Sequence, residues 1–535
     1  MKTQRRRRTP ARVEGLEGRA LLATTTGLQA AYFNETNYTG TSVSRVDRAI
    51  DFSWGAGAPA SGINGDTFAA RWTTRVKTQT SETYRLYLVS ESPVRLWIGD
   101  RLVIDGWKTR TAPVINRGSF AFTANVRYPV QIELMHGTGN ASIKWHWQTD
   151  TVVKQTVPNR LMLPADETVQ NKLNHAVAYA RDRIARTLQE LPTTANGYPE
   201  STMSTGKWLL RPVTAWTSGY FGGAMWQLDK LFPGAGWDAT ATPWSTPMAT
   251  QAQSTGDHFA RIWPTIKPLY DKTGSATHRQ TIIAGANAKN AQFNSTINAF
   301  KTPEITSNSG NPSANFGILM DQTLDLEVLF WASDATGNPS YRENAVKHLQ
   351  TVIAHMIRPD GSVFQRFFFN EATGTPIGGE NWQGYSNTST WSRGQAWAVY
   401  GISRIAELTG RSDFVAAARK VSDYFITHLP GDYVPYWDFQ APGIPNTYRD
   451  SSAAAIAARG LIRLGKVTGD ATYTTAAGNI LASLSSPKYL TDGTSSRGVL
   501  QHAALHVPSN RAVDASIVFA DYYFLEAASA YMNRG

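Results

Sequence analysis

Hydrophobic and polar residues recur with different periods in two parts of the chain. From about Thr26 to Thr149, short runs such as TYRLYLVS and ASIKWHWQT alternate apolar with polar positions, and Gly, Pro, Ser and Asn separate them. Alternation with a period of two is typical of β-strands with one buried face, so these runs predict a β-sandwich. From Asp166 onward, apolar residues recur every three or four positions, which predicts α-helices.

The helical part contains a repeated stop signal, a Thr-Gly pair. The pair occurs at positions 273–274, 336–337, 409–410 and 468–469, with Pro-Gly at 233–234 as a weaker copy. Glycine in this place ends a helix because it adopts the left-handed conformation without strain. The segments that begin sixteen or seventeen residues before these glycines start polar and become apolar. An inner helix with its N-terminal end at a cavity would have this pattern.

A sixth segment of this kind, VDASIVFADYYFLEAASAY, lies near the end of the chain. Amphipathic helices such as YRENAVKHLQTVIAHMI, which places Tyr341, Ala345, Leu349, Val352 and Met356 on one stripe, can cover the inner ones. Six inner helices with outer partners predict a closed toroid, an (α/α)6 barrel. The expected fold is therefore an N-terminal all-β sandwich followed by an all-α barrel.

These patterns divide the 535 residues into four parts. We expect residues 1–25 to be a basic export leader or a disordered tail, 26–150 the sandwich, 151–165 a linker and 166–535 the barrel. Export would place the protein outside the cell or in the periplasm.

Charge and composition exclude several classes of protein. Residues 1–25 hold seven Lys or Arg and two Glu, so they supply +5 of the net charge of +11 and leave only +6 for the other 510 residues. That charge does not support nucleic-acid binding. No apolar run reaches the ~18 residues of an integral membrane segment. The chain has no cysteine, which excludes disulfides and thiolate chemistry. The oligomeric state is left open.

Two aspartates are candidates for acid–base catalysis. Asp321 lies in GILMDQTLDLEVLFWAS, where apolar neighbours would raise the pKa of its carboxyl and keep it protonated, as a general acid requires. Asp257 occupies the equivalent place in the preceding helical unit, and Asp325 lies one turn after Asp321. The alternative is that each aspartate merely caps a helix.

Other residues could hold a sugar. Arg393 could pair with a substrate carboxylate through two parallel hydrogen bonds, or it could form a structural ion pair. Indole faces for sugar rings, which could equally be core residues, are available at Trp216, Trp391, Trp397 and Trp437. The ten histidines show no metal-ligand spacing, and nucleotide and zinc-protease motifs are absent, so we expect neither metal nor cofactor.

Long motifs in the helical part resemble the unsaturated glucuronyl hydrolases, glycoside hydrolase family 88. They are FWASDATG, IRPDGSVFQ, QGYSNTSTWSRGQAWAVYG, VPYWDFQAPGIP and RDSSAAAIAARGL. The resemblance implies an (α/α)6 barrel. It also implies hydration of the C4=C5 double bond of an unsaturated uronic acid that ends a lyase-generated oligosaccharide, so that the uronate and the neighbouring sugar separate.

The same resemblance implies roles for individual residues. Asp321 matches the acid/base that protonates C4 and activates the water attacking C5, and Asp257 matches the second aspartate. Substrate-binding positions are matched by Trp216, Gln383, Arg393 and Trp397, and we add His258, beside Asp257, and Gln365. The chain departs from the family in two places, because Gly256 and Gln365 stand where the family has histidine.

The strand-rich part resembles the protective-antigen-like (PA fourteen) family in GLQAAYF, DFSWGAGAP, DTFAARWTTRV and VRLWIGDRLVIDGW. This resemblance implies a β-sandwich that binds polysaccharide, in some members with calcium. The aspartates that hold calcium are replaced here by Ser90-Glu91-Ser92-Pro93. Two readings other than a glucuronyl hydrolase stay open. One is another barrel enzyme, either an unsaturated rhamnogalacturonyl hydrolase or an inverting glycosidase. The other is a non-catalytic carbohydrate-binding protein.

Overall fold

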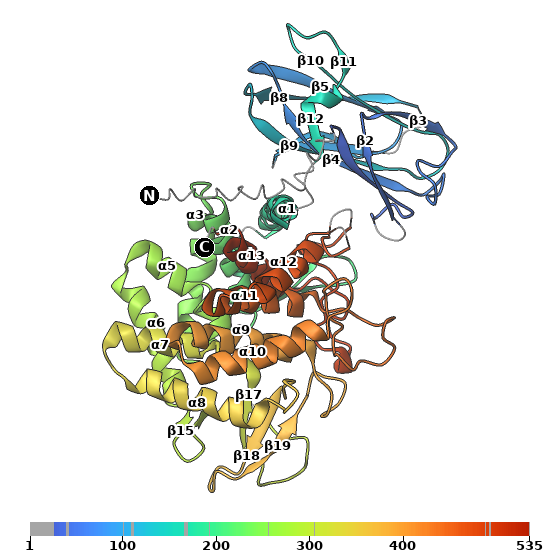
Figure 1. Cartoon of the computed structure of the whole chain (residues 1–535). Coiled ribbons are helices and arrows are strands. Elements are labelled where there is room, and N and C mark those ends of the chain that lie inside the picture. Colours follow the sequence, from blue (N-terminus) through green and yellow to red (C-terminus); the bar gives the residue numbers. More distant parts are fainter. Residues whose placement is uncertain are drawn as a thin grey trace, which may run out of the picture. The chain divides into compact units, whose positions relative to one another are not determined.

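The computed structural model describes residues 26–533 except 39–41, 100, 109–111, 165–168, 192, 255, 304, 487, 492 and 493. The chain divides between residues 165 and 166 into two compact units, the first built of strands and the second mainly of helices (Figure 1). The leader that we predicted for residues 1–25 lies outside the described residues. None of the helices that the structure describes combines the length and the hydropathy of a membrane span.

The first unit is a β-sandwich, as the alternating pattern predicts. Its strands are β1 Leu28–Phe33, β2 Ser42–Asp47, β3 Asp51–Gly55, β4 Ala69–Lys77, β5 Glu82–Ser90, β6 Val94–Ile98, β7 Arg101–Gly106, β8 Val114–Phe122, β9 Arg127–Met135, β10 Ala141–Gln148, β11 Gln155–Thr156 and β12 Met162–Pro164. One sheet has the order β2-β1-β4-β9-β6-β7, with β12 beside β4, and the other the order β11-β10-β5-β8, with β3 beside β10.

The core of the sandwich lies between the two sheets. Buried residues alternate with more exposed ones along β1, β6 and β10, because successive side chains point to opposite faces. Trp145 is buried in this core, whereas Trp97 and Trp107 keep part of their surface exposed. The guanidinium of Arg95 lies 4.4 Å from the ring centre of Trp107.

The segment that we predicted to be a linker, residues 151–165, is instead largely part of the sandwich. Strand β11 pairs with β10 and β12 pairs with β4, so the segment extends both sheets. Val157 and Met162 bury their side chains in the core. The prediction was wrong because strands of two and three residues are too short to show a period.

The second unit is an (α/α)6 barrel, as the repeated stop signal predicts. Its inner helices are α2 Gly219–Leu231, α4 His258–Arg261 with α5 Ile266–Thr273, α7 Leu326–Thr336, α9 Ser392–Thr409, α11 Ser451–Thr468 and α13 Val518–Tyr531. The outer helices are α1 Val169–Glu190, α3 Trp237–Ser245, α6 Ala276–Asn290, α8 Ser340–Met356, α10 Ser412–Thr427 and α12 Ala471–Leu484. Neighbouring inner helices touch all the way round, from α2 through α4, α7, α9, α11 and α13 back to α2.

Short strands and turns connect these helices. The strands are β13 Tyr198–Thr202, β14 Trp208–Arg211, β15 Phe293–Asn294, β16 Ala299–Phe300, β17 Phe316–Leu319, β18 Arg366–Phe369 and β19 Pro376–Glu380. The 3-10 turns of the barrel are η2 Thr194–Asn196, η3 Thr246–Gln251, η4 Met320–Leu324 and η5 Val507–Ser509, whereas η1 Asn159–Leu161 lies in the sandwich between β11 and β12. The turn η4 leads into the inner helix α7, and β17 precedes it.

Four inner helices, α5, α7, α9 and α11, end in the same cap. Each ends at the threonine of a Thr-Gly pair, and the glycine that follows is left-handed, with φ between 63° and 73°. The threonine hydroxyl donates to the carbonyl four residues earlier, as Thr409 does to Ile405 at 2.7 Å. This cap satisfies carbonyls that a helix end leaves unpaired, and it confirms the stop signal.

Two mouths open along the barrel axis, one at each end of the inner helices. Between them lie the buried rings of Tyr220, Trp397 and Tyr523, which we call the aromatic layer. The Tyr220 and Tyr523 hydroxyls are 3.4 Å apart, and Trp397 meets Tyr523 edge-on with ring centres 5.4 Å apart. The aromatic layer therefore separates the polar side chains at one mouth from those at the other.

Candidate active site

A pocket of about 310 Å³ lies at the mouth formed by the N-terminal ends of the inner helices. It brings together seven of the eight site residues predicted from the sequence with residues that the sequence did not indicate. Its lining consists of Trp216, Asp257, Ile305, Leu319, Asp321, Gln365, Arg366, Trp382, Gln383, Trp391, Arg393, Trp397, Leu505, His506 and Arg511.

Asp321 has the environment that a general acid needs. It lies in the turn η4, between strand β17 and helix α7, and its Oδ1 atom is buried without a hydrogen-bond partner among the described residues. Burial raises the pKa of Asp321 to about 7, and the negative charge of Asp257 contributes in the same direction. Near neutral pH this carboxyl can therefore both give and take a proton.

Asp257 reaches the pocket through an uncommon backbone conformation. Its φ of 57° and ψ of 35° are left-handed, although it is not a glycine. Its carbonyl accepts from the amides of Ala260 and Arg261, so the backbone starts helix α4. A non-glycine residue in this conformation costs on the order of 1–2 kcal/mol. Strain of this kind is typical of functional sites, where the surrounding structure holds it in place.

Gln365 and Gln383 form a reciprocal pair on one wall of the pocket. The Nε2 atom of Gln365 donates to Oε1 of Gln383 at 2.8 Å, and the backbone amide of Gln383 donates to Oε1 of Gln365 at 2.8 Å. Gln383 in turn donates to the carbonyl of Leu505 at 2.8 Å. The two amides are fixed by each other and by the segment that carries Leu505.

Arg393 lines the pocket, but its guanidinium is held by the protein. Its Nη1 atom lies 2.6 Å from Oδ2 of Asp450, and both side chains are at most 1% exposed. It also donates to the carbonyls of Ala504 and Leu505. The two-pronged contact with a substrate carboxylate that we predicted is therefore not supported, and the arrangement is the structural ion pair that was its alternative.

The predicted tryptophans lie in different surroundings. Trp216 is partly exposed in the pocket, and its ring centre lies 5.2 Å from that of Phe519. Trp391 and Trp397 line the pocket but are almost completely buried. Trp437 packs instead against Ala441 and Ala504 and does not line it. Of these four, Trp216 is the one open to a sugar ring, and Trp382, which the sequence analysis did not indicate, also lines the pocket and is 53% exposed.

His258 does not line the pocket, contrary to our prediction. Its side chain is buried and its Nε2 atom lies 3.1 Å from the carbonyl oxygen of Ala252. Asp325, which we expected on the face of Asp321, is also buried elsewhere, in an ion pair of 3.2 Å with Lys289. His258 differs from the expectation because it follows the left-handed Asp257 directly. Asp325 differs because Asp321 lies in a 3-10 turn, where residues four apart do not share a face as they do in an α-helix.

The sequence analysis did not indicate three pocket residues with ionisable side chains, namely Arg366, His506 and Arg511. Arg366 pairs with Glu380 at 2.8 Å and Arg511 with Glu200 at 2.8 Å. The Nδ1 atom of His506 accepts from the amide of Ser509 at 3.2 Å, so the ring proton is on Nε2, which is buried without a partner in the described structure. Arg366 follows Gln365 directly, but His506 and Arg511 lie in an irregular segment that has no periodic signal.

Comparisons with known proteins show where this site belongs. Residues 24–160 match the PA14 domain. An unsaturated glucuronyl hydrolase of Formosa agariphila is 31% identical over 379 residues, which cover 69% of this chain and 94% of that protein. The chain belongs to the unsaturated glucuronyl hydrolase family.

Further members of the unsaturated glucuronyl hydrolase family agree with this assignment. The enzyme of Bacillus sp. (strain GL1) is 27% identical over 360 residues, which cover 65% of this chain and 94% of that protein. A solved structure of an unsaturated glucuronyl hydrolase specific for heparin superposes with a TM-score of 0.64 at 27% identity, covering 69% of this chain and 98% of that one. Both resemblances found in the sequence, and the barrel fold, are thereby confirmed.

The two positions at which the resemblance led us to expect histidine, Gly256 and Gln365, both make contacts in the barrel. The carbonyl of Gly256 accepts from Arg261, and Gln365 makes the paired amide contact with Gln383. No cluster of three or more His, Asp or Glu side chains suited to a metal ion occurs among the residues that the structure describes.

Proposed function

We propose that this protein hydrates the C4=C5 double bond of a 4,5-unsaturated uronic acid at the end of a lyase-generated oligosaccharide. The observation that carries the proposal is Asp321. A carboxyl whose Oδ1 is buried without a partner among the described residues, and whose pKa is raised to about 7 by burial and by Asp257, is suited to protonating an electron-rich double bond. The names of the relatives, unsaturated glucuronyl hydrolases, agree with this reaction.

The proposed reaction adds one water molecule across the double bond. Asp321 gives its proton to C4, and the positive charge that develops at C5 is shared with the ring oxygen. The oxygen of a water molecule bonds to C5, and its proton passes to the Asp321 carboxylate, which restores the acid. The resulting hemiketal opens, C1 is left as a hemiacetal of the neighbouring sugar, and that sugar leaves.

The remaining pocket residues supply binding and orientation. Three arginines, Arg366, Arg393 and Arg511, are each fixed by a carboxylate, so their guanidinium groups keep their positions in the pocket and need not reorganise when the uronate binds. The pKa of His506 is lowered, first by burial, so the ring stays neutral near pH 7 and its Nε2–H can donate to a substrate oxygen. The exposed face of Trp216 can pack against the sugar.

The test is the absorbance of the unsaturated uronate, followed with lyase-made disaccharides from several glycans. We expect the absorbance to disappear with at least one disaccharide, and Asp321→Asn to slow that loss by about 10²-fold or more while binding survives. Asp334→Asn, at an exposed position on the same barrel, is the matched control. Absence of reaction with every disaccharide would contradict the proposal.

We further propose that the protein is exported and that the sandwich retains it on polysaccharide. The PA14 match supports the second part, as do Arg95, Trp97 and Trp107, whose side chains lie on or beside strand β6 and remain partly exposed. Fractionation of producing cells tests export. A pull-down with insoluble glycan, using Trp97→Ala and Trp107→Ala against the unchanged protein, tests retention, and equal retention would refute it.

A further inference from the structure

A second pocket opens at the opposite mouth of the barrel, among the C-terminal halves of the inner helices. Its volume is about 580 Å³, and helices α2, α5, α7, α9, α11 and α13 all contribute to its lining. The aromatic layer separates it from the candidate active site, and none of the residues given a role in the proposed reaction lines it. This volume lies within the range of small-ligand sites, ~300–1,000 Å³.

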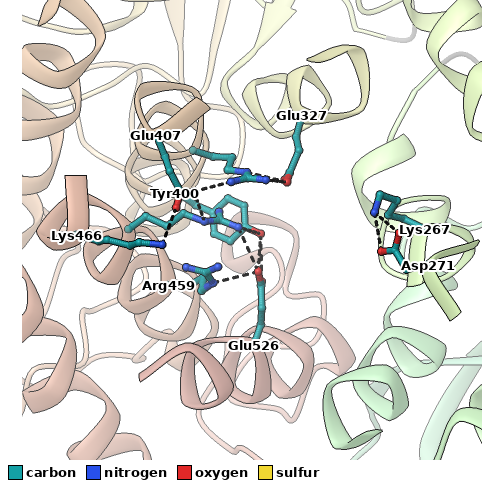
Figure 2. A network of polar contacts seen from close by, with 10 residues as sticks. Lys267, Asp271, Glu327, Tyr400, Glu407, Arg459, Lys466 and Glu526 are labelled. Atoms are coloured by element: carbon teal, nitrogen blue, oxygen red, sulfur yellow. Dashed lines mark hydrogen bonds and ion pairs between the residues drawn. The ribbon is translucent and has the colours of Figure 1, made fainter. Parts of the chain in front are cut away.

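One wall of the second pocket is a fixed network of charged side chains (Figure 2). The Tyr400 hydroxyl donates to Glu526 at 3.0 Å, and Arg459 donates to the same carboxylate at 3.2 Å. Arg463 is 5% exposed and lies between two carboxylates, 3.4 Å from Glu526 and 3.8 Å from Glu407. The network therefore presents rigid donors and acceptors.

Arg404 extends this wall toward helix α7. It donates to Glu327 at 2.7 Å and to Glu407 at 2.5 Å. Because each carboxylate is held by an arginine, these groups keep their positions whether or not a ligand is present.

The opposite wall combines indole faces with another ion pair. Trp263 and Trp331 are partly exposed in the pocket, and Tyr270 meets Trp331 edge-on with ring centres 5.6 Å apart. Lys267 lies 2.6 Å from Asp271, and Figure 2 shows this pair on the far side of the pocket from Tyr400 and Glu526. Apolar faces thus stand opposite polar groups across one cavity.

We propose that the second pocket binds an uncharged saccharide. Its lining holds six acidic and six basic side chains, so its formal charges balance, and all of them except Lys230 form ion pairs among the described residues. A ligand with a net charge would therefore meet little counter-charge that is not already paired. Sugar hydroxyls both donate and accept, and so can bond to a carboxylate and a guanidinium that lie side by side. The apolar face of a sugar ring can cover Trp263 or Trp331.

This site goes beyond the proposed reaction, because it lies at the other mouth and selects a different sugar. A saccharide bound here leaves the candidate active site open. The second pocket would therefore bind uncharged parts of a glycan and keep the enzyme on it. The candidate active site of the same molecule, or of another molecule of this protein, would then act on the terminal uronate.

The test is calorimetric titration of the full-length protein with uncharged hexasaccharides, namely cellohexaose, maltohexaose, mannohexaose and chitohexaose, and with hexagalacturonate for comparison. We expect at least one uncharged probe to bind and Trp331→Ala to raise its Kd roughly ten-fold. Tyr448→Ala, an exposed aromatic outside both pockets, is the matched control and should leave Kd unchanged. Turnover of an unsaturated disaccharide should be the same in both variants, which separates this site from the candidate active site.

Asp271→Asn keeps the proposal testable if Trp331→Ala does not fold, because the Asp271 side chain is 55% exposed. It should raise the Kd of the same probe roughly five-fold. Failure of all four uncharged probes to bind would overturn the proposal. So would binding that neither substitution weakens, since the saccharide would then be held elsewhere, for instance on the sandwich.

Discussion

Asp450 and Arg393 form a salt bridge of 2.6 Å that is almost completely removed from solvent. Asp450 also accepts from the amide of Ser452 at the start of helix α11, while Arg393 donates to the carbonyls of Ala504 and Leu505. One ion pair thus joins two inner helices to the segment that forms a wall of the candidate active site. Arg393 therefore supports this wall of the pocket.

Breaking this pair should destabilise the barrel strongly. Asp450→Ala leaves a buried guanidinium without its counter-ion, for which we expect a loss of about 3–5 kcal/mol in the free energy of unfolding. Asp413→Ala, which removes an exposed pair with Arg411, is the matched control and should cost less than about 1 kcal/mol. Urea titrations measure both. Similar losses in the two variants would show that the buried pair contributes no more to the free energy of unfolding than the exposed pair does.

Replacing Arg393 should affect binding through the pocket wall. Arg393→Lys keeps the charge but cannot reach Asp450, Ala504 and Leu505 together, because an ammonium lacks the planar fork. We expect KM for an unsaturated disaccharide to rise about ten-fold, as Leu505 no longer holds Gln383, with a smaller change in kcat. A change confined to kcat would instead place Arg393 at the reacting atoms.

The sequence predicts the barrel and the general acid Asp321 well, because the sequence signals for both involve only residues close together in the chain. The Thr-Gly caps require only neighbouring residues, and the apolar neighbours of Asp321 already indicate a raised pKa. The partner of Arg393 could not be predicted, because Asp450 is 57 positions away and nothing in the sequence links them. His258 was misplaced because the left-handed backbone of Asp257, which turns the two side chains apart, has no sequence signal at a non-glycine residue.

The acid should set the pH dependence of the reaction. Asp321 must be protonated to give a proton to C4, and its pKa is raised to about 7. The value of kcat/KM should therefore be high below that pH and fall as the pH rises through it. The same shift affects stability. The folded state holds the proton more tightly than the unfolded chain, so stability decreases as the pH rises from about 4 to about 7. Asp321→Asn should make this decrease smaller, which thermal unfolding across that range would detect; the rest comes from Asp521, whose pKa burial also raises to about 7.

Asp257 should control that pKa. Its negative charge raises the pKa of Asp321, so Asp257→Asn should lower it and move the descending limb of the pH–rate profile to lower pH. At pH 7 the variant should therefore lose more activity than at pH 5. An unchanged limb would mean that burial alone sets the pKa of Asp321.

The last prediction concerns the independence of the two units. Strand β12 ends at Pro164 and belongs to the sandwich, so a chain that begins at Leu163 would carry a fragment of that sheet, whereas a chain that begins at Asp166 contains the barrel unit without the sandwich. The closed ring of inner helices buries its own core, so this shorter chain should fold and hydrate a soluble unsaturated disaccharide at close to the full-length rate.

If the sandwich retains the enzyme on glycan, its removal should weaken only the pull-down with insoluble polymer, because tethering raises local concentration without altering the site. Comparing the two chains in both assays separates the possibilities. Loss of activity on the disaccharide would show that the sandwich is needed for the fold or the site of the barrel, and an unchanged pull-down would show that it does not bind the polymer.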